Sequence, residues 1–298
     1  MVSAVVFAYH NVGVRCLQVL LARGVDVRLV VTHEDRPGET IWFASVKKLA
    51  EELGLPVITP ANPNTDDIEQ RVRAAQPDFL FSFYYRHMLT QPLLQIPPRG
   101  AYNMHGSLLP KYRGRVPVNW AVINGETQTG ATLHVMAEKP DAGAIVDQTA
   151  VPILPNDTAR EVFDKVVVAA EITLHRCLPA LIEDRALLAP QDLATGSYFG
   201  GRKAEDGRID WTRSAQDIHN LVRGVTRPYP GAFSDTGKGR LVLWRTLLQP
   251  ATDAGAPTLM LKDNHVVARC LGGGTLRILD AELNGQTVAL AMLPIALT

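Results

Sequence analysis

The fold is decided by residues 3–32, which read SAVVFAYHNVGVRCLQVLLARGVDVRLVVT. An apolar, β-branched run comes first, and residues 12–23 then follow a helical pattern that Gly24 closes. A second β-rich run, VDVRLVVT, ends the stretch. Strand, helix and strand in this order predict a parallel βαβ unit.

The same alternation continues to residue 85. Patterns predict a helix over 42–53 stopped by Gly54, a strand LPVIT, a helix over 65–75 with Thr65 as N-cap, and a strand DFLFSFYY. We therefore expect a doubly wound, Rossmann-like, mostly parallel sheet. In such sheets the site lies beyond the carboxyl ends of the strands, where the segments FAYH, FSFYYRH and AYNMHG would converge.

Beyond this region the pattern changes twice. Residues 130–138 and 144–153 predict an antiparallel extension of the sheet, and 157–184 a long helix. A short helix over 214–225 is followed by alternating strands, which indicate a small OB-like β-barrel with Trp211 and Trp244 in its core. We expect a catalytic domain over 1–190, a Gly-rich linker over 191–210 and the barrel domain over 211–298.

Composition narrows the class of protein. The chain has 298 residues, 46% hydrophobic and 20% charged, without an apolar run long enough to span a bilayer. Its N-terminal stretch reads as a strand rather than a signal peptide, and its three cysteines are odd in number and widely spaced, so we expect a cytoplasmic protein without disulfides or zinc. Thirty basic residues balance thirty acidic ones, which argues against a nucleic-acid partner.

Two common nucleotide-binding motifs are missing. The loop after the first strand reads YHNVGVRC, with Gly13 alone in place of G-x-G-x-x-G, and no G-x-x-x-x-G-K-[ST] occurs. A single glycine cannot bring the backbone against a pyrophosphate, so a nicotinamide or flavin enzyme is disfavoured.

The segment NMHGSLLPKYRG, residues 103–114, carries the strongest chemical signal. Asn103 and His105 are two residues apart, so they share one face of a strand, and a carboxamide N–H beside an imidazole can stabilise a developing oxyanion. Asp141, in the turn KPDAG, is a carboxylate that would orient His105 and raise its pKa if the two met. The alternative is a loop-capping Asn, an ordinary core His and an ordinary turn Asp.

These motifs resemble those of the 10-formyltetrahydrofolate-dependent formyltransferases: NMHGSLLPKYRG and DAGAIV in the first part, GGRKAEDGRIDW and RPYPGAF in the second. The resemblance covers nearly the whole chain and implies that Asn103, His105 and Asp141 are catalytic. It implies 10-formyltetrahydrofolate as cosubstrate and no metal. Residues expected to bind the folate are His87, Met88, Leu89, Arg115, Ala137, Glu138, Lys139 and Pro140.

Three basic residues of the segment 111–115 have more than one possible partner. Lys111, Arg113 and Arg115 would meet either the glutamate tail of the folate or the phosphates of a sugar nucleotide, or form a solvated surface.

Within the family, the motifs are most similar to the domain that formylates UDP-4-amino-4-deoxy-L-arabinose, which serves lipid A modification and polymyxin resistance. That domain belongs to a bifunctional enzyme, and the chain ends at Thr298, soon after the expected barrel, without the decarboxylase half. A separately encoded decarboxylase, a shortened chain and a stand-alone relative acting on another amino sugar all stay open, as do monomer and homodimer.

The alternatives are methionyl-tRNA formyltransferase, a non-catalytic folate or nucleotide-sugar binding module, and a formyltetrahydrofolate hydrolase. The tRNA enzymes carry a longer, glycine- and lysine-rich loop within the segment that here reads HEDRPGETIWFASVKKLAEELGLP, with Thr40, Ile41 and Trp42 in its place. This difference favours a nucleotide-linked sugar over tRNA.

Overall fold

The computed structural model describes residues 1–35, 40–249 and 255–297. The chain divides into two compact units, each assembled from separate stretches of sequence. The first unit consists of 1–117, 129–151 and 164–199, and the second of 118–128, 152–163 and 200–298. Among the helices of the described residues, none is both long enough and apolar enough to cross a membrane.

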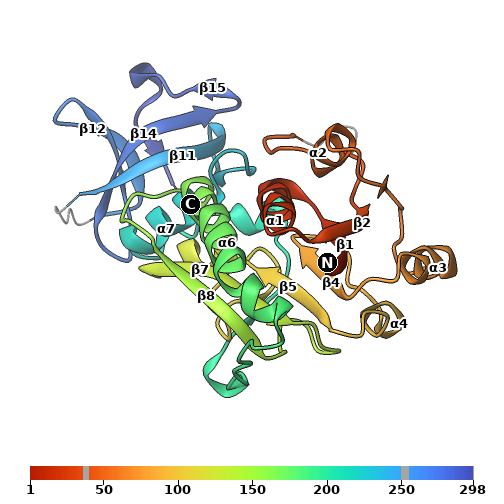
Figure 1. Ribbon diagram of the computed structural model, residues 1–298. Helices are drawn as coiled ribbons and strands as arrows, with labels where there is room; N and C mark the ends of the chain where they lie inside the picture. The colour runs from red at the N-terminus through yellow and green to blue at the C-terminus, as the bar shows by residue number, and fades with distance from the viewer. Residues whose placement is uncertain (36–39, 250–254, 298) are drawn as a thin grey trace. The chain divides into compact units, whose positions relative to one another are not determined.

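A seven-stranded sheet forms the first unit, in the order β3-β2-β1-β4-β5-β7-β8 (Figure 1). Its first five strands pair in parallel, and β7 runs antiparallel to β5, as the sequence predicts. The strands are β1 (Ser3–Ala8), β2 (Asp26–Val31), β3 (Val57–Ile58), β4 (Phe79–Phe83), β5 (Ala101–His105), β7 (Gln128–Val135) and β8 (Ile145–Pro152). The strand order reverses between β1 and β4, so the carboxyl ends of β1, β4 and β5 are neighbours at the switch point.

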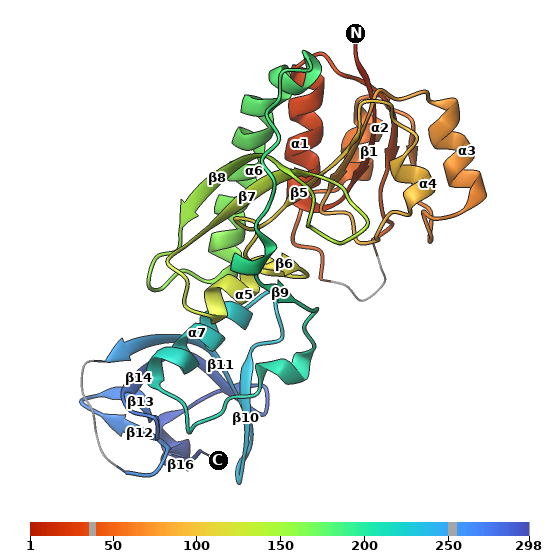
Figure 2. The same cartoon turned by 90° about the horizontal axis from the view of Figure 1, so that it is seen from below.

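Helices cover both faces of this sheet. Helices α3 (Asp66–Ala74) and α4 (Gln91–Leu94) pack on the face that carries Val5 and Phe7 of β1. On the opposite face, Gly13 of α1 (His10–Ala22) lies against Ala8, and α2 (Val46–Glu52) packs next to it. Helix α6 (Ala159–Ile182) lies beside α1 (Figure 2), joined by an ion pair between Arg15 and Glu171.

Some predicted boundaries were wrong for local reasons. The helix expected over 42–53 begins at Val46, because the Ser45 hydroxyl accepts the Lys48 N–H and so caps it there. Thr65 does occupy the N-cap position of α3, but its side chain makes no capping hydrogen bond. The expected strand over 55–59 is reduced to two residues at the sheet edge.

The second unit is a curled antiparallel sheet around its own core. Strands follow the order β10-β11-β14-β13-β12-β16, with β15 paired to β14. Their bounds are β10 (Ala232–Thr236), β11 (Gly239–Gln249), β12 (Thr258–Lys262), β13 (His265–Arg269), β14 (Thr275–Leu283), β15 (Gln286–Thr287) and β16 (Ile295–Ala296). Helix α7 (Ala215–Val225) packs against the core, and α5 (Pro117–Ile123) lies mostly in this unit.

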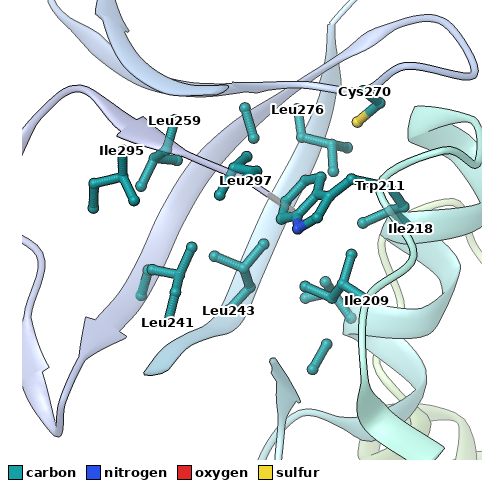
Figure 3. Packing of buried hydrophobic residues seen from close by; sticks show 14 of the residues in the cluster. Ile209, Trp211, Ile218, Leu241, Leu243, Leu259, Cys270, Leu276, Ile295 and Leu297 are labelled. Atoms are coloured by element: carbon teal, nitrogen blue, oxygen red, sulfur yellow. The ribbon is translucent and has the colours of Figure 1, made fainter. Parts of the chain in front are cut away.

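Trp211 confirms its predicted core position and Trp244 does not. Trp211 packs among Leu243, Leu276 and Ile218 (Figure 3), and its indole N–H donates to Ser234 Oγ at 3.1 Å. Trp244 alternates with the buried Leu243 on β11 and lies half-buried outside this core, with Arg227 stacked on its ring.

The segment between the predicted domains is not unstructured. Residues 191–210 contain the short strand β9 (Tyr198–Phe199) and two 3₁₀ turns, Leu193–Thr195 and Ala204–Gly207. Strand β9 pairs in parallel with β6 (Arg113–Gly114) and so holds the end of the segment that begins at Asn103.

Candidate active site

Strand β5 presents Asn103 and His105 on one face of the sheet, as predicted from their spacing. On the neighbouring strand β7, His134 pairs with Asn103, and Thr132 pairs with His105. Paired residues on neighbouring strands point to the same side, so two imidazoles, a carboxamide and a hydroxyl gather on this face.

Asp141 joins this group from the loop between β7 and β8. Its Oδ1 lies 3.6 Å from His105 Nδ1 and 3.5 Å from His134 Nε2. Its Oδ2 accepts the Gly114 N–H at 2.8 Å. The carboxylate therefore meets both imidazoles, each at a distance slightly longer than a direct hydrogen bond.

The loop around Asp141 is held in an uncommon conformation. Asp141 has a φ of 52°, in the left-handed region that non-glycine residues rarely adopt. Gln191 holds this turn from a distant part of the chain, because its Nε2 donates to the carbonyls of Asp141 at 2.9 Å and Gly143 at 2.6 Å.

The imidazole of His105 has a fixed orientation. Its Nε2 donates to the Tyr112 carbonyl at 2.8 Å, so Nε2 carries a proton and Nδ1 is the nitrogen that faces Asp141. Burial lowers the pKa of His105; Asp141 and the Tyr112 carbonyl raise it, but by less, and the net pKa lies below the usual value. Asp141 does raise the pKa of His105, as expected. The net increase in this pKa that the sequence suggested is absent, because the His105 side chain is only 7% exposed.

Asp141 stays ionised in spite of its partial burial. Burial alone would raise its pKa, but the neighbouring His105, then His134 and the Gly114 N–H, outweigh this effect and lower the pKa of Asp141 below its usual range. A carboxylate is therefore available beside both rings at neutral pH.

His134 is a residue that the sequence analysis did not select. Its side chain is 1% exposed, and it lies within a strand that otherwise reads as plain sheet core. The signal in the sequence is a histidine within the buried run GATLHV, but its partner across the sheet follows only from the strand register.

Polar contacts fix the loop that follows β5. Thr132 Oγ1 donates to the Ser107 carbonyl at 2.6 Å and accepts the Leu109 N–H at 3.2 Å. Gly114 is required where β6 meets β9, because a Cβ there would lie 2.2 Å from the Phe199 carbonyl oxygen. These contacts place the Gly114 N–H at Asp141.

The three basic residues of this loop differ in their surroundings. Lys111 and Arg115 are exposed, whereas Arg113 is buried, and its Nε and Nη1 have no hydrogen-bond partner among the described residues. Since buried guanidinium nitrogens without acceptors are costly, Arg113 is the member of this set that best fits an anion.

The residues expected to bind folate lie on two loops. Residues His87, Met88 and Leu89 lie between β4 and α4; Leu89 is buried, Met88 is exposed, and the Met88 carbonyl accepts Asn64 Nδ2 at 2.8 Å. Ala137, Glu138 and Lys139 are exposed, and Pro140 half-buried, in the loop after β7. Leu89 and Met136 pack on the same hydrophobic cluster, which brings the two loops to one end of the sheet.

Neither Ser107 nor a cysteine of the described residues is arranged as a covalent nucleophile for this group. The Ser107 hydroxyl donates to the Lys111 carbonyl at 2.7 Å. Cys16, Cys177 and Cys270 are all buried, and burial raises the pKa of each thiol. In the described part of the chain, no group of three or more His, Cys, Asp or Glu side chains is placed to hold a metal.

The fold and the site together define a class. A carboxamide donor and an imidazole beside a carboxylate are groups that can stabilise a developing oxyanion, and a doubly wound sheet presents them at the end of its strands. Comparison with known families agrees with this class. The formyl transferase model matches residues 9–178, more than half of the 298-residue chain, and the formyl transferase C-terminal domain model matches residues 202–291.

The chain belongs to the formyl transferase family. It is a formyltransferase whose two family domains follow each other in the expected order.

Solved structures share the fold at low sequence identity. An N-formyltransferase from Helicobacter canadensis, in complex with folinic acid and dTDP-3-aminofucose, has a TM-score of 0.75 at 21% identity, covering 97% of this chain and 100% of that one. WlaRD, a sugar 3N-formyl transferase in the presence of dTDP and 5-N-formyl-THF, has a TM-score of 0.72 at 19% identity, covering 97% of this chain and 98% of that one. A sugar N-formyltransferase from a Shewanella species has a TM-score of 0.65 at 19% identity, covering 82% of this chain and 96% of that one.

Proposed function

We propose that this protein transfers the formyl group of 10-formyltetrahydrofolate to the amine of a nucleotide-linked amino sugar. The observation that carries the proposal is the convergence of Asn103, His105 and Asp141 on one face of the sheet edge. The Helicobacter canadensis structure with folinic acid and dTDP-3-aminofucose, and WlaRD with 5-N-formyl-THF and dTDP, support the donor and the acceptor class. UDP-4-amino-4-deoxy-L-arabinose is the acceptor that we propose, on the motifs of the sequence.

The reaction proceeds in two steps without a covalent enzyme intermediate. The neutral amine attacks the formyl carbon, and the carbonyl electrons move to the oxygen, which accepts an N–H from Asn103. His105 Nδ1 takes the proton that leaves the attacking nitrogen, and the imidazolium is stabilised by Asp141 at 3.6 Å. As the bond from carbon to N10 breaks, the same proton passes to N10, which gives the formamide and tetrahydrofolate.

The state of His105 suits this role. Because burial holds its pKa below the usual value, the ring is neutral at neutral pH, and the Tyr112 carbonyl keeps the proton on Nε2. The lone pair therefore lies on Nδ1, on the side of Asp141. In this scheme the Tyr112 carbonyl orients the neutral ring, and Asp141 stabilises the imidazolium that forms when Nδ1 accepts a proton.

The folate is proposed to lie against the loops that carry His87–Leu89 and Ala137–Pro140, with Arg115 at the rim. The exposed Met88 offers an apolar surface to a flat heterocycle, since its side chain is 59% exposed while Asn64 holds its backbone. Arg113, buried with two guanidinium nitrogens that lack acceptors among the described residues, is proposed to meet a phosphate or the carboxylate of the glutamate tail.

Methionyl-tRNA is the competing acceptor. The balance of thirty basic and thirty acidic residues favours a small-molecule substrate. Residues 36–39, in the loop that distinguishes the tRNA enzymes, lie outside the described residues, and of the neighbouring positions the Trp42 ring packs on His10 at 4.5 Å.

The test is a screen of UDP- and dTDP-linked amino sugars with 10-formyltetrahydrofolate, followed by mass spectrometry for one added formyl group. We expect UDP-4-amino-4-deoxy-L-arabinose to be formylated and a matched sugar without the amine to be inert. Formylation of methionyl-tRNA but of no sugar would reverse the assignment. Release of formate from the donor at full rate without any amine would indicate a hydrolase.

A further inference from the structure

The two ring nitrogens of His134 make different contacts. Its Nδ1 lies 2.9 Å from the Val135 carbonyl, which can only accept, so Nδ1 carries the proton. Its Nε2 lies 3.1 Å from Asn103 Nδ2, and an amide nitrogen can only donate. In this arrangement Nε2 accepts the hydrogen bond from Asn103.

One atom of His134 connects two groups of the site. Nε2 accepts from Asn103 and also lies 3.5 Å from Asp141 Oδ1. The amide nitrogen and the carboxylate therefore both lie beside the same ring nitrogen. If Nε2 carried a proton instead, it would donate to Asp141, and the carboxamide would have to turn its oxygen toward the ring.

We propose that His134 is a positioning residue, whose unprotonated Nε2 holds the amide nitrogen of Asn103 on the Asp141 side and leaves its second N–H for the oxygen that becomes charged. This inference rests on the proposed function, because it assigns Asn103 to that oxygen. His134 itself does not touch the substrate. It acts through Asn103.

The fold makes this arrangement rigid. Asn103 and His134 are directly paired residues of two neighbouring strands, and the imidazole is 1% exposed, so close packing restricts the ring. The backbone contact to Val135 fixes the tautomer from the opposite side of the ring. A carboxamide alone can rotate by half a turn, and the imidazole removes this freedom.

A double-mutant cycle tests the proposal with the amino sugar and 10-formyltetrahydrofolate as substrates. His134→Leu removes the acceptor, and we expect kcat to fall about 10- to 100-fold while KM for the folate changes less than about threefold. In an Asn103→Ala background the same change should cost less than about threefold in kcat, because the group that it positions is gone. Losses that multiply in the double variant would overturn the proposal.

Rescue separates positioning from folding. His134→Gln offers an amide oxygen near the place of Nε2, and we expect kcat within about tenfold of the original. His219→Leu is the matched control, since His219 is equally buried but lies in the second unit with Thr246. It should lower the melting temperature without changing kcat. A Gln variant that folds normally and is as slow as the Leu variant would contradict the role.

An NMR measurement that does not depend on turnover separates the proposed role of His134 from the proposed formyl transfer. In ¹⁵N-labelled protein, the imidazole shifts should show His134 neutral, with the proton on Nδ1 and none on Nε2. A protonated Nε2 would overturn the inference whatever the activity. If the unaltered protein formylates no amine but shows this tautomer, the proposed function fails while the contact between His134 and Asn103 stands.

Discussion

At the scale of single residues, the site depends on how burial and charge act against each other at His105. Burial disfavours the imidazolium, and Asp141 favours it, and the balance leaves the ring neutral with a carboxylate ready beside it. This arrangement gives a base that becomes a stabilised cation only when it accepts a proton. The sequence could suggest that Asp141 meets His105, but not which effect on the pKa of His105 is larger. Burial follows from the packing of β5, β7 and the loop after them.

The sign of this balance gives a prediction for Asp141→Asn. Asp141 raises the pKa of His105, so removing its charge should lower that pKa further below the usual value. Titration of the His105 ring proton by NMR in both proteins measures the difference. A higher pKa in the variant would show that Asp141 does not act on His105 through its charge.

Stability has a related dependence on pH. The folded-state pKa of His105 is lower than the unfolded value of about 6.5, so the folded protein binds fewer protons between these two values. The stability that the neutral ring contributes is present above about pH 6.5 and is lost as the pH falls through the folded-state pKa.

At the scale of elements, register and loop contacts complete the site. The period of two predicts that Asn103 and His105 share a face, and this prediction is confirmed by β5. His134 could not be predicted in this way, because no local pattern states which residue of β7 lies opposite Asn103. Gln191 was missed for a similar reason, since it holds the Asp141 turn from after α6, far away in the chain.

Gln191→Ala should therefore slow catalysis without touching the reacting groups. Loss of the two bonds to the Asp141 and Gly143 carbonyls frees the strained turn, and a small displacement of the carboxylate should lower kcat about 10- to 100-fold. Steady-state kinetics measure the effect. Gln70→Ala, on the exposed side of α3, is the matched control and should be neutral. Equal rates for both variants would show that the clamp has no catalytic consequence.

At the scale of the whole molecule, the alternation of strands and helices is enough to predict the first unit, and alternating strands are enough to predict a second β unit. Details that depend on packing were not predictable. Trp211 and Trp244 both looked like core residues, yet the alternation on β11 places Leu243 inside and Trp244 outside. The structure assigns 118–128 and 152–163 to the second unit, and local pattern does not state which core a segment joins.

We propose that Asn103 and His105 act as one site for formyl transfer together with Asp141, which lies 36 residues after His105 in the sequence. Turnover of Asp141→Asn with saturating 10-formyltetrahydrofolate and the amino sugar tests it most directly, with Asp147→Asn, a carboxylate of β8 paired with Arg176, as control. We expect kcat to fall at least about a hundredfold in Asp141→Asn, with folate affinity little changed, and to stay normal in the control. A near-normal rate for Asp141→Asn would contradict it.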